Sequence, residues 1–424
     1  MAADQSPALP KNPDLERFRR DARRLQRALV AGEQQALDLH TRLHPAGADA
    51  PVTLTAAQLT IARFVGFASW PRLRSFLIET RDLRRDPAAE ADGSASPADR
   101  FLALACLTYS DLDHPDRRTQ AVELIRGEPD LVTRSLSVAA AVGDIEAVLG
   151  HLATDPSGAL TLAGPHRWPP LLYLTYSRVP QADALGTARV LLDAGADPDA
   201  GFLWQGFTPP FTALTGCFGE GEGGPARQPR HPDGERLALL LLERGAAVND
   251  AQTLYNRMFG RDDSHLRLLF DHGLGDGDLG AWQTRLGDGT ESVAQMMRRQ
   301  LDWAADHGQT DRLTLLAEHG FHPRSSSAGA APDVHRAGTP EGVRAAVAAG
   351  ADVNALEQGR TALHQAAWIG DEQLVAALLD AGADPTIRDL THDGTPLDWA
   401  GHGLQPGTAA LLRERVGRVE DSAG

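Results

Sequence analysis

The sequence predicts an all-α fold, a solenoid of repeated helix pairs with short hairpin loops, preceded by a separate helical module. The segment that starts at Thr361 recurs 34 positions later at Thr395. Self-similarity at a period of roughly 20–50 residues is typical of stacked repeats. In the module, apolar residues recur from Leu15 to Leu29 at steps of three and four. That spacing predicts one face of an amphipathic helix.

The composition is that of a folded protein with a strong negative charge. Of 424 residues, 42% are hydrophobic and 23% are charged, and the formal net charge is −16. Such a charge disfavours binding to nucleic acid or to an anionic membrane. Arg17, Arg20, Arg24 and Arg27 form a basic helix face, but Asp21 lies among them. A solvated surface is therefore favoured there over a nucleic-acid site.

Targeting and redox signals are sparse. The first 15 residues are polar and lack the apolar stretch of a signal peptide. No apolar run approaches the ~18 residues of a membrane-spanning helix. Two cysteines, Cys106 and Cys217, cannot build a disulfide framework or a cysteine-rich zinc site. We therefore expect a cytoplasmic protein with neither a nucleic-acid nor a membrane partner.

Residues 359–385 carry the clearest copy of the repeat. Thr361 can cap a helix, and Gly370 stands where the chain needs a left-handed conformation after the helix. The sequence T-A-L-H-Q-A-A-W-I-G, followed by L-L-D-A-G-A-D, resembles the ankyrin repeat. The resemblance implies an ankyrin-type solenoid, in which His364 forms a hydrogen bond that ties adjacent loops together.

Weaker copies extend this resemblance upstream, so that a degenerate array is expected over 135–424. The copy at 334–354 has a shortened first helix. Breaks in the spacing predict insertions near 219–234 and 274–291. The glycine, proline and acidic residues of these insertions favour exposed loops.

The chain ahead of the array divides into three parts. Residues 1–83 form the helical module, in which Thr55 is expected to cap a helix. Residues 84–97 are expected to be a polar linker, and 98–134 a helix pair that joins the module to the repeats. Residues 57–73 resemble an N-terminal helical module found ahead of ankyrin repeats in some bacterial proteins. That resemblance implies no chemistry.

Catalytic and metal-binding motifs do not appear in the sequence. It contains no phosphate-binding glycine loop followed by lysine, no G-x-S-x-G and no H-E-x-x-H. His319 and His322 flank a predicted helix end, and no further metal ligands stand near them. The Asp-Gly run from Asp276 has a glycine where a calcium loop needs glutamate. We expect no cofactor and no metal ion.

Ankyrin stacks present the first helix of each repeat on a concave face, and aligning the copies identifies the exposed positions. Many of these positions are aromatic although only 5% of the chain is aromatic. Tyrosine and tryptophan are typical of interface hot spots. A hairpin tip with three aromatic residues, 202–207, adds a second candidate. The predicted partner-binding residues are Tyr173, Tyr176, Phe202, Trp204, Trp303, Asp306, Arg336, Gln365, Trp368 and Trp399. The alternatives are that the first-helix aromatic side chains fill gaps between irregular repeats, and that the hairpin tip folds back onto the repeat below it.

The predicted function is a protein–protein recognition scaffold that binds another protein through the concave face, without catalysis. One alternative is an enzyme or small-molecule binder with a pocket under the inserted loops. Its candidate residues are Tyr173, Tyr176, Asp306, His307 and Arg336. The other alternative is an acidic inhibitor that occupies a basic site on another protein.

Overall fold

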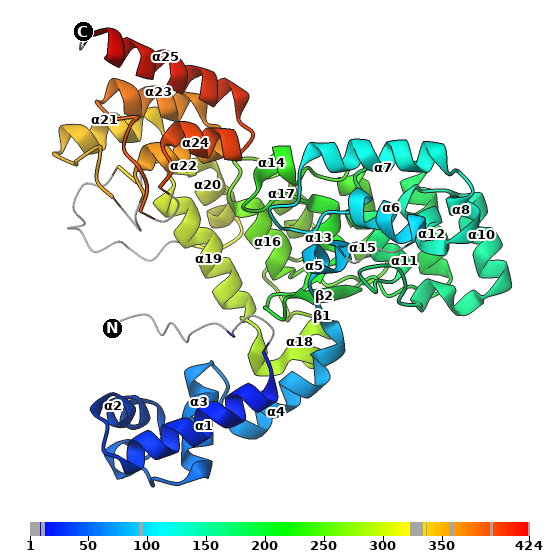
Figure 1. Cartoon of the computed structure of the whole chain (residues 1–424), viewed down its shortest axis with the longest axis horizontal. Coiled ribbons are helices and arrows are strands. Elements are labelled where there is room, and N and C mark those ends of the chain that lie inside the picture. Colours follow the sequence, from blue (N-terminus) through cyan, green and yellow to red (C-terminus); the bar gives the residue numbers. More distant parts are fainter. Residues whose placement is uncertain are drawn as a thin grey trace.

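The computed structural model describes residues 9, 13–92, 96–322, 334–335, 337–356, 360–390 and 393–422. These residues are mostly helical, as the sequence predicts, and Arg336 lies outside them. Figure 1 shows the N-terminal module at the bottom, a central stack of helices beside it and above it, and a smaller C-terminal stack at the top left. None of the described helices combines the length and the apolar character needed to cross a bilayer.

The N-terminal module is built from helices that begin at polar caps. Its elements are α1 (Leu15–Val30), α2 (Gln34–Leu43), η1 (Gly47–Asp49), α3 (Leu54–Phe64), α4 (Trp70–Glu79) and η2 (Arg81–Leu83). Phe18, on the predicted apolar face of α1, is buried. The cap of α3 is Thr53 rather than Thr55, because its side chain accepts a hydrogen bond from the Ala56 N–H at 3.2 Å.

The expected linker at 84–97 is instead attached to the stack at its start. Residues Arg84–Arg85 form strand β1, which pairs in parallel with β2 (Gly201–Trp204). Strand β2 pairs antiparallel with β3 (Phe211–Thr212), so the sheet order is β1-β2-β3. Helix α5 (Pro87–Asp92) follows β1. The mostly helical chain therefore contains a small sheet that fastens this segment to the repeats.

The central stack runs from α6 to α20 in two layers of helices around one apolar core. First helices α9, α11, α13, α16 and α19 contact one another in turn, and second helices α10, α12, α15 and α17 form the layer behind them. The elements are α6 (Pro97–Ala105), α7 (Pro115–Gly127), α8 (Leu131–Arg134), α9 (Leu136–Ala141), α10 (Ile145–Thr154), η3 (Pro156–Leu160), α11 (Pro170–Tyr176), α12 (Ala184–Asp193), α13 (Ala213–Phe218), α14 (Gly224–Arg227), α15 (Gly234–Glu243), α16 (Ala251–Met258), α17 (Ser264–Phe270), α18 (Ala281–Leu286), η4 (Gly287–Gly289), α19 (Val293–Asp306) and α20 (Thr310–Glu318).

The C-terminal stack has a core of its own, from Val334 to Leu412. Helix α22 packs on α24, and α23 packs on α21 and α25. The elements are α21 (Pro340–Ala348), α22 (Ala362–Ile369), α23 (Glu372–Asp380), α24 (Pro396–His402) and α25 (Pro406–Ser422). Residues 334–335 and 337–339, where this copy should have its first helix, form turns and coil. We call the boundary between the two stacks the seam.

Both predicted insertions contain a helix and some buried side chains, so they are not simply exposed loops. In the insertion near 274–291, Trp282 and Leu286 of α18 are buried in a core shared with the N-terminal module. The Trp282 indole Nε1–H donates to the Asp199 carbonyl at 3.1 Å. In the insertion near 219–234, Gln228 and His231 are buried as well. The insertions are packing elements because each carries a few apolar or hydrogen-bonding side chains among its polar residues.

Candidate functional site at the seam

The tyrosines of α11 are buried in the core, so the prediction that they lie on an exposed face is wrong. Tyr173 and Tyr176 are both 0% exposed. The Tyr173 hydroxyl donates to the Ala163 carbonyl at 2.8 Å, and the Tyr176 hydroxyl donates to the Thr212 carbonyl at 2.9 Å. Burial raises the pKa of both tyrosines far above the usual value. The packing alternative holds here, and neither hydroxyl is available for catalysis.

The hairpin tip folds back onto these tyrosines. Phe202, predicted to bind a partner, is 2% exposed and lies against Trp168, with ring centroids 4.9 Å apart. Its other face meets Phe211 of β3 at 5.5 Å. Trp204 is half-buried, and its Nε1–H donates to the Thr108 carbonyl at 2.9 Å. Burying aromatic area stabilises the hairpin more than exposing it to solvent would.

The tryptophans of the later repeats remain half-buried. Trp303 on α19 stacks on His307, with centroids 3.7 Å apart, and meets Phe259 edge-on at 5.0 Å. Trp368 on α22 lies 5.9 Å from Trp399 on α24 in a T-shaped pair. The structure thus brings Trp368 and Trp399 together. Trp303 packs instead with His307, a candidate of the small-molecule alternative, and with Phe259, which the sequence did not single out.

Neighbouring loops accept hydrogen bonds from the indole N–H groups of Trp368 and Trp399. The Trp368 Nε1–H donates to the Glu222 carbonyl at 2.7 Å, and the Trp399 Nε1–H donates to the Asp389 carboxylate at 2.8 Å. Asp306 is exposed at the end of α19, and Gln365 is half-buried on α22. These contacts fix the orientation of the rings while part of their surface stays accessible.

A groove of about 830 Å³ lies along the seam, beside Trp368. Its walls are the loop at 220–225, the loop at 259–262, the start of α21 and the junction of α22 with α23. Acidic side chains outnumber basic ones along these walls. The charged lining residues are Glu220, Glu222, Asp262, Glu341, Asp371 and Glu372, with Arg230 and Arg261.

Part of this acidic charge is neutralised inside the protein. Buried Arg257 pairs with Glu220 and with Asp262, the latter at 2.7 Å. Arg230 pairs with the same two carboxylates, at 3.0 Å and 2.6 Å. Burial alone would raise the pKa of Asp262, but Ser264 hydrogen bonds and the two arginines outweigh it, so the pKa is lowered. This network holds the loop at 259–262 against the insertion.

The remaining carboxylates face the groove more openly. Glu222, Glu341 and Glu372 are exposed. The Tyr255 hydroxyl donates to Glu222 at 2.5 Å, and Arg344 pairs with Glu341 at 2.5 Å from outside the groove. The groove surface is therefore negative, and field lines concentrated in such a concave site attract cations.

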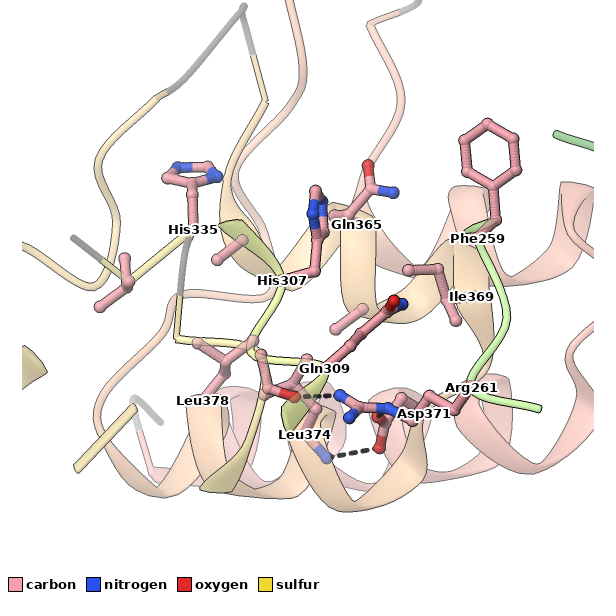
Figure 2. A pocket seen from close by; sticks show the side chains of 14 residues that line it. Phe259, Arg261, His307, Gln309, His335, Gln365, Ile369, Asp371, Leu374 and Leu378 are labelled. Atoms are coloured by element: carbon pink, nitrogen blue, oxygen red, sulfur yellow. Dashed lines mark hydrogen bonds and ion pairs between the residues drawn. The ribbon is translucent and has the colours of Figure 1, made fainter. Parts of the chain in front are cut away.

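A smaller cavity of about 50 Å³ adjoins the groove, and Figure 2 shows the side chains that line it. It shares Phe259, Arg261, Ile369 and Asp371 with the groove. Arg261 pairs with Asp371 at 3.3 Å and also donates to the Gly338 carbonyl. The Arg261–Asp371 pair therefore lies at the boundary between groove and cavity, and it joins a loop of the central stack to α23.

Gln309 is the buried polar residue on the wall of this inner cavity. Its Nε2–H₂ donates to the Met258 carbonyl at 3.1 Å and to the Gly260 carbonyl at 3.3 Å. Its Oε1 is buried and accepts no hydrogen bond. The side chain extends toward Ile369 (Figure 2). An unpaired buried carbonyl oxygen is costly, so a donor that entered the cavity would be stabilised there.

Sequence reasoning missed Gln309, Arg261 and the carboxylates of the groove. The one sequence feature that could have led to them is the shortened first helix of the copy at 334–354. Where the first helix of a repeat is missing, the neighbouring helices lack a packing partner on that side, and polar residues line the space that remains. The prediction placed binding residues on helices and did not consider what a missing helix exposes.

The hydrogen bonds around His364 have the form that the repeat resemblance implies. The Thr361 N–H donates to His364 Nδ1 at 3.2 Å, so Nε2 carries the proton and donates it to the Gly394 carbonyl at 3.0 Å. Burial lowers the pKa of His364, which keeps the ring neutral in this role. The contact ties the start of one copy to the loop before the next.

Comparison with known proteins agrees with this geometry. The ankyrin-repeat family profile matches residues 358–390. The chain contains an ankyrin repeat. A solved structure that is similar to the chain is the human ASB11 ankyrin repeat domain, at 17% identity, with 66% of this chain and 96% of that chain covered and a TM-score of 0.26. No curated protein matches the chain.

Proposed function

We propose that this chain is a protein-recognition scaffold whose partner binds at the seam. The observation that carries the proposal is the open groove, which combines an acidic wall with the half-buried Trp368 and its neighbour Trp399. Ankyrin repeats are built as stacked helix pairs that offer extended binding surfaces. Partly exposed tryptophans held by polar neighbours are the residues on which interface energy concentrates.

The proposed binding surface lies on the later repeats. Near α11, Trp168, Tyr176 and Phe202 pack against one another, and none of these rings keeps an accessible face. The surface from α19 to α24 keeps Trp303, Trp368 and Trp399 half-buried. A partner would therefore contact the C-terminal half of the repeat array.

A quantitative capture experiment tests this function. The wild-type protein is compared in host lysate with the double variant Trp303→Ala/Trp368→Ala. A matched control, Leu149→Ala/Leu239→Ala, removes exposed apolar side chains from second helices. The proposal expects a protein that the wild type and the control enrich and the tryptophan variant does not, with melting temperatures that stay close together. Equal enrichment by all three would contradict it.

A further inference from the structure

The seam has a feature that a general binding surface does not need. A small cavity shares lining residues with the acidic groove, and one residue of its wall, Gln309, has a buried Oε1 that accepts no hydrogen bond from the described residues. The cavity is large enough for one or two water molecules or for the end of one side chain. We propose that the seam binds a lysine- or arginine-bearing segment of the partner protein, and that one cationic side chain extends toward Gln309. This inference rests on the proposed recognition function.

Charge is the first argument for a cationic guest. Glu222, Glu341 and Glu372 are exposed on the groove walls, and the groove's own arginines are already paired with other carboxylates. An incoming cation therefore meets Glu222 and Glu372, which form no ion pair with a described residue, whereas Glu341 is already paired with Arg344. Such complementarity accelerates association and excludes acidic segments.

The protein's own Arg261 is the second argument. Its guanidinium lies at the boundary of groove and cavity, where it pairs with Asp371 and donates to the Gly338 carbonyl. The Asp371 carboxylate also caps α23 by accepting from the Leu374 N–H at 2.9 Å, so its position is fixed. This junction thus already holds one guanidinium, and its acceptors suit the same group from a partner.

The unpartnered oxygen is the third argument. Gln309 is 7% exposed, and its amide nitrogen is fixed by the Met258 and Gly260 carbonyls. Gln309 lines the cavity, and Oε1 is the acceptor of this side chain that no described donor pairs with. A lysine or arginine N–H supplies a donor, whereas an acidic or purely apolar side chain does not.

Calorimetric titration with short peptides tests the proposal. The probe is N-acetyl-Gly-Arg-Arg-Gly-amide, and the two comparison peptides replace arginine with glutamate or with a shorter guanidino amino acid of equal charge. The groove variant is Glu222→Gln/Glu341→Gln/Glu372→Gln. The matched control, Glu123→Gln/Glu146→Gln/Glu235→Gln, removes the same charge from exposed positions elsewhere.

The proposal expects the groove variant to bind the arginine probe about tenfold more weakly, while the control variant binds as the wild type does. The shorter guanidino peptide should bind at least threefold more weakly than the arginine probe, because it does not reach the inner cavity. The glutamate peptide should not bind.

Three outcomes would overturn the proposal. Equal weakening in the groove variant and the control variant would mean diffuse attraction by the net charge. Equal affinity for the long and short guanidino peptides would mean that only water reaches Gln309. If a captured partner depends on Trp368 but tolerates the groove variant, the recognition function stands and the basic-segment proposal fails.

Discussion

Helices α11 and α22 occupy the same place in their repeats, yet their aromatic residues have different surroundings. Tyr173 and Tyr176 on α11 are fully buried, whereas Trp368 on α22 is half-buried beside an open groove. The difference comes from segments outside the repeats. Around α11, the β2–β3 hairpin and the chain near Trp168 cover the first-helix layer. The position of a residue within its repeat therefore does not decide whether its side chain is exposed. Exposure depends on whether segments outside the repeat cover that position.

The seam and the central core differ in a related way. The central core is continuous and apolar from Phe101 to Leu316, and a second core starts at Val334. Between them, Arg261 forms an ion pair with Asp371, and Gln309 donates hydrogen bonds to the carbonyls of Met258 and Gly260. Exchanging such polar contacts for contacts with a partner costs less free energy than breaking apolar packing would. This difference supports the proposal that the seam is the binding surface of the array.

The largest effect on stability is expected when an aromatic residue is removed from the covered region around α11. Trp168→Ala should destabilise the protein by about 3–5 kcal/mol, because a fully buried ring leaves a cavity. Trp368→Ala should cost about 1 kcal/mol or less, because its ring is already partly solvated. Urea unfolding followed by circular dichroism measures both. Similar losses for the two variants would show that α22 is covered as fully as α11.

The next largest effect is expected at the junction between the N-terminal module and the central stack. Trp282 is 3% exposed in the core that α18 shares with that module. Trp282→Ala should weaken this junction by about 3 kcal/mol and expose the segment near 84–92 to protease. Limited proteolysis with mass spectrometry detects the cleavage. A variant as resistant as the control Leu160→Ala, which changes an exposed leucine, would contradict the packing role of α18.

Acid should destabilise the central stack. Burial lowers the pKa of His166, His231 and His265, with that of His231 lowered to about 3 from the ordinary 6.5. The unfolded chain binds a proton below pH 6.5 and the folded chain does not. Stability is therefore fully present above pH 6.5 and falls as the pH drops toward 3.

The variant His231→Gln isolates one of these histidines. It should reduce the slope of stability against pH, between pH 6 and 4, by about 1.4 kcal/mol per pH unit. Chemical denaturation at several pH values measures that slope. An unchanged slope would mean that His231 is protonated in the folded protein.

A smaller effect is expected at the loop tie of the C-terminal stack. His364→Ala removes the hydrogen bonds to Thr361 and Gly394 and should cost about 1–2 kcal/mol. Hydrogen exchange should quicken in the segment at 389–395 and stay unchanged in α11. Uniform quickening over both stacks would show that the two cores unfold as one unit.

Much of the fold followed from local sequence. The apolar spacing from Leu15 to Leu29 predicts α1, and the copy around His364 predicts both α22 and its loop hydrogen bond. These features depend on residues close in the chain. Predictions failed for Tyr173 and Phe202 because their burial depends on segments that are distant in sequence.

The insertion near 274–291 illustrates a second limit. Its aspartates and glycines suggested an exposed loop, yet Leu279, Trp282 and Leu286 recur at steps of three and four and are all buried. The polar composition of this insertion as a whole gave no indication of the short apolar face that these three residues form. The groove was missed for another reason: it forms between two stacks, and no single segment carries its pattern.

Site-specific photo-crosslinking tests the central claim, that the partner binds at the seam, most directly. A photoreactive benzoylphenylalanine is placed at exposed Gln373, which lines the groove, or at exposed Glu146 on α10 of the central stack. The account predicts that, in host lysate, the groove position yields a cross-linked protein that the α10 position does not, and that Trp303→Ala/Trp368→Ala abolishes the product. A product from α10 alone, or one that is indifferent to the tryptophan variant, would contradict the account.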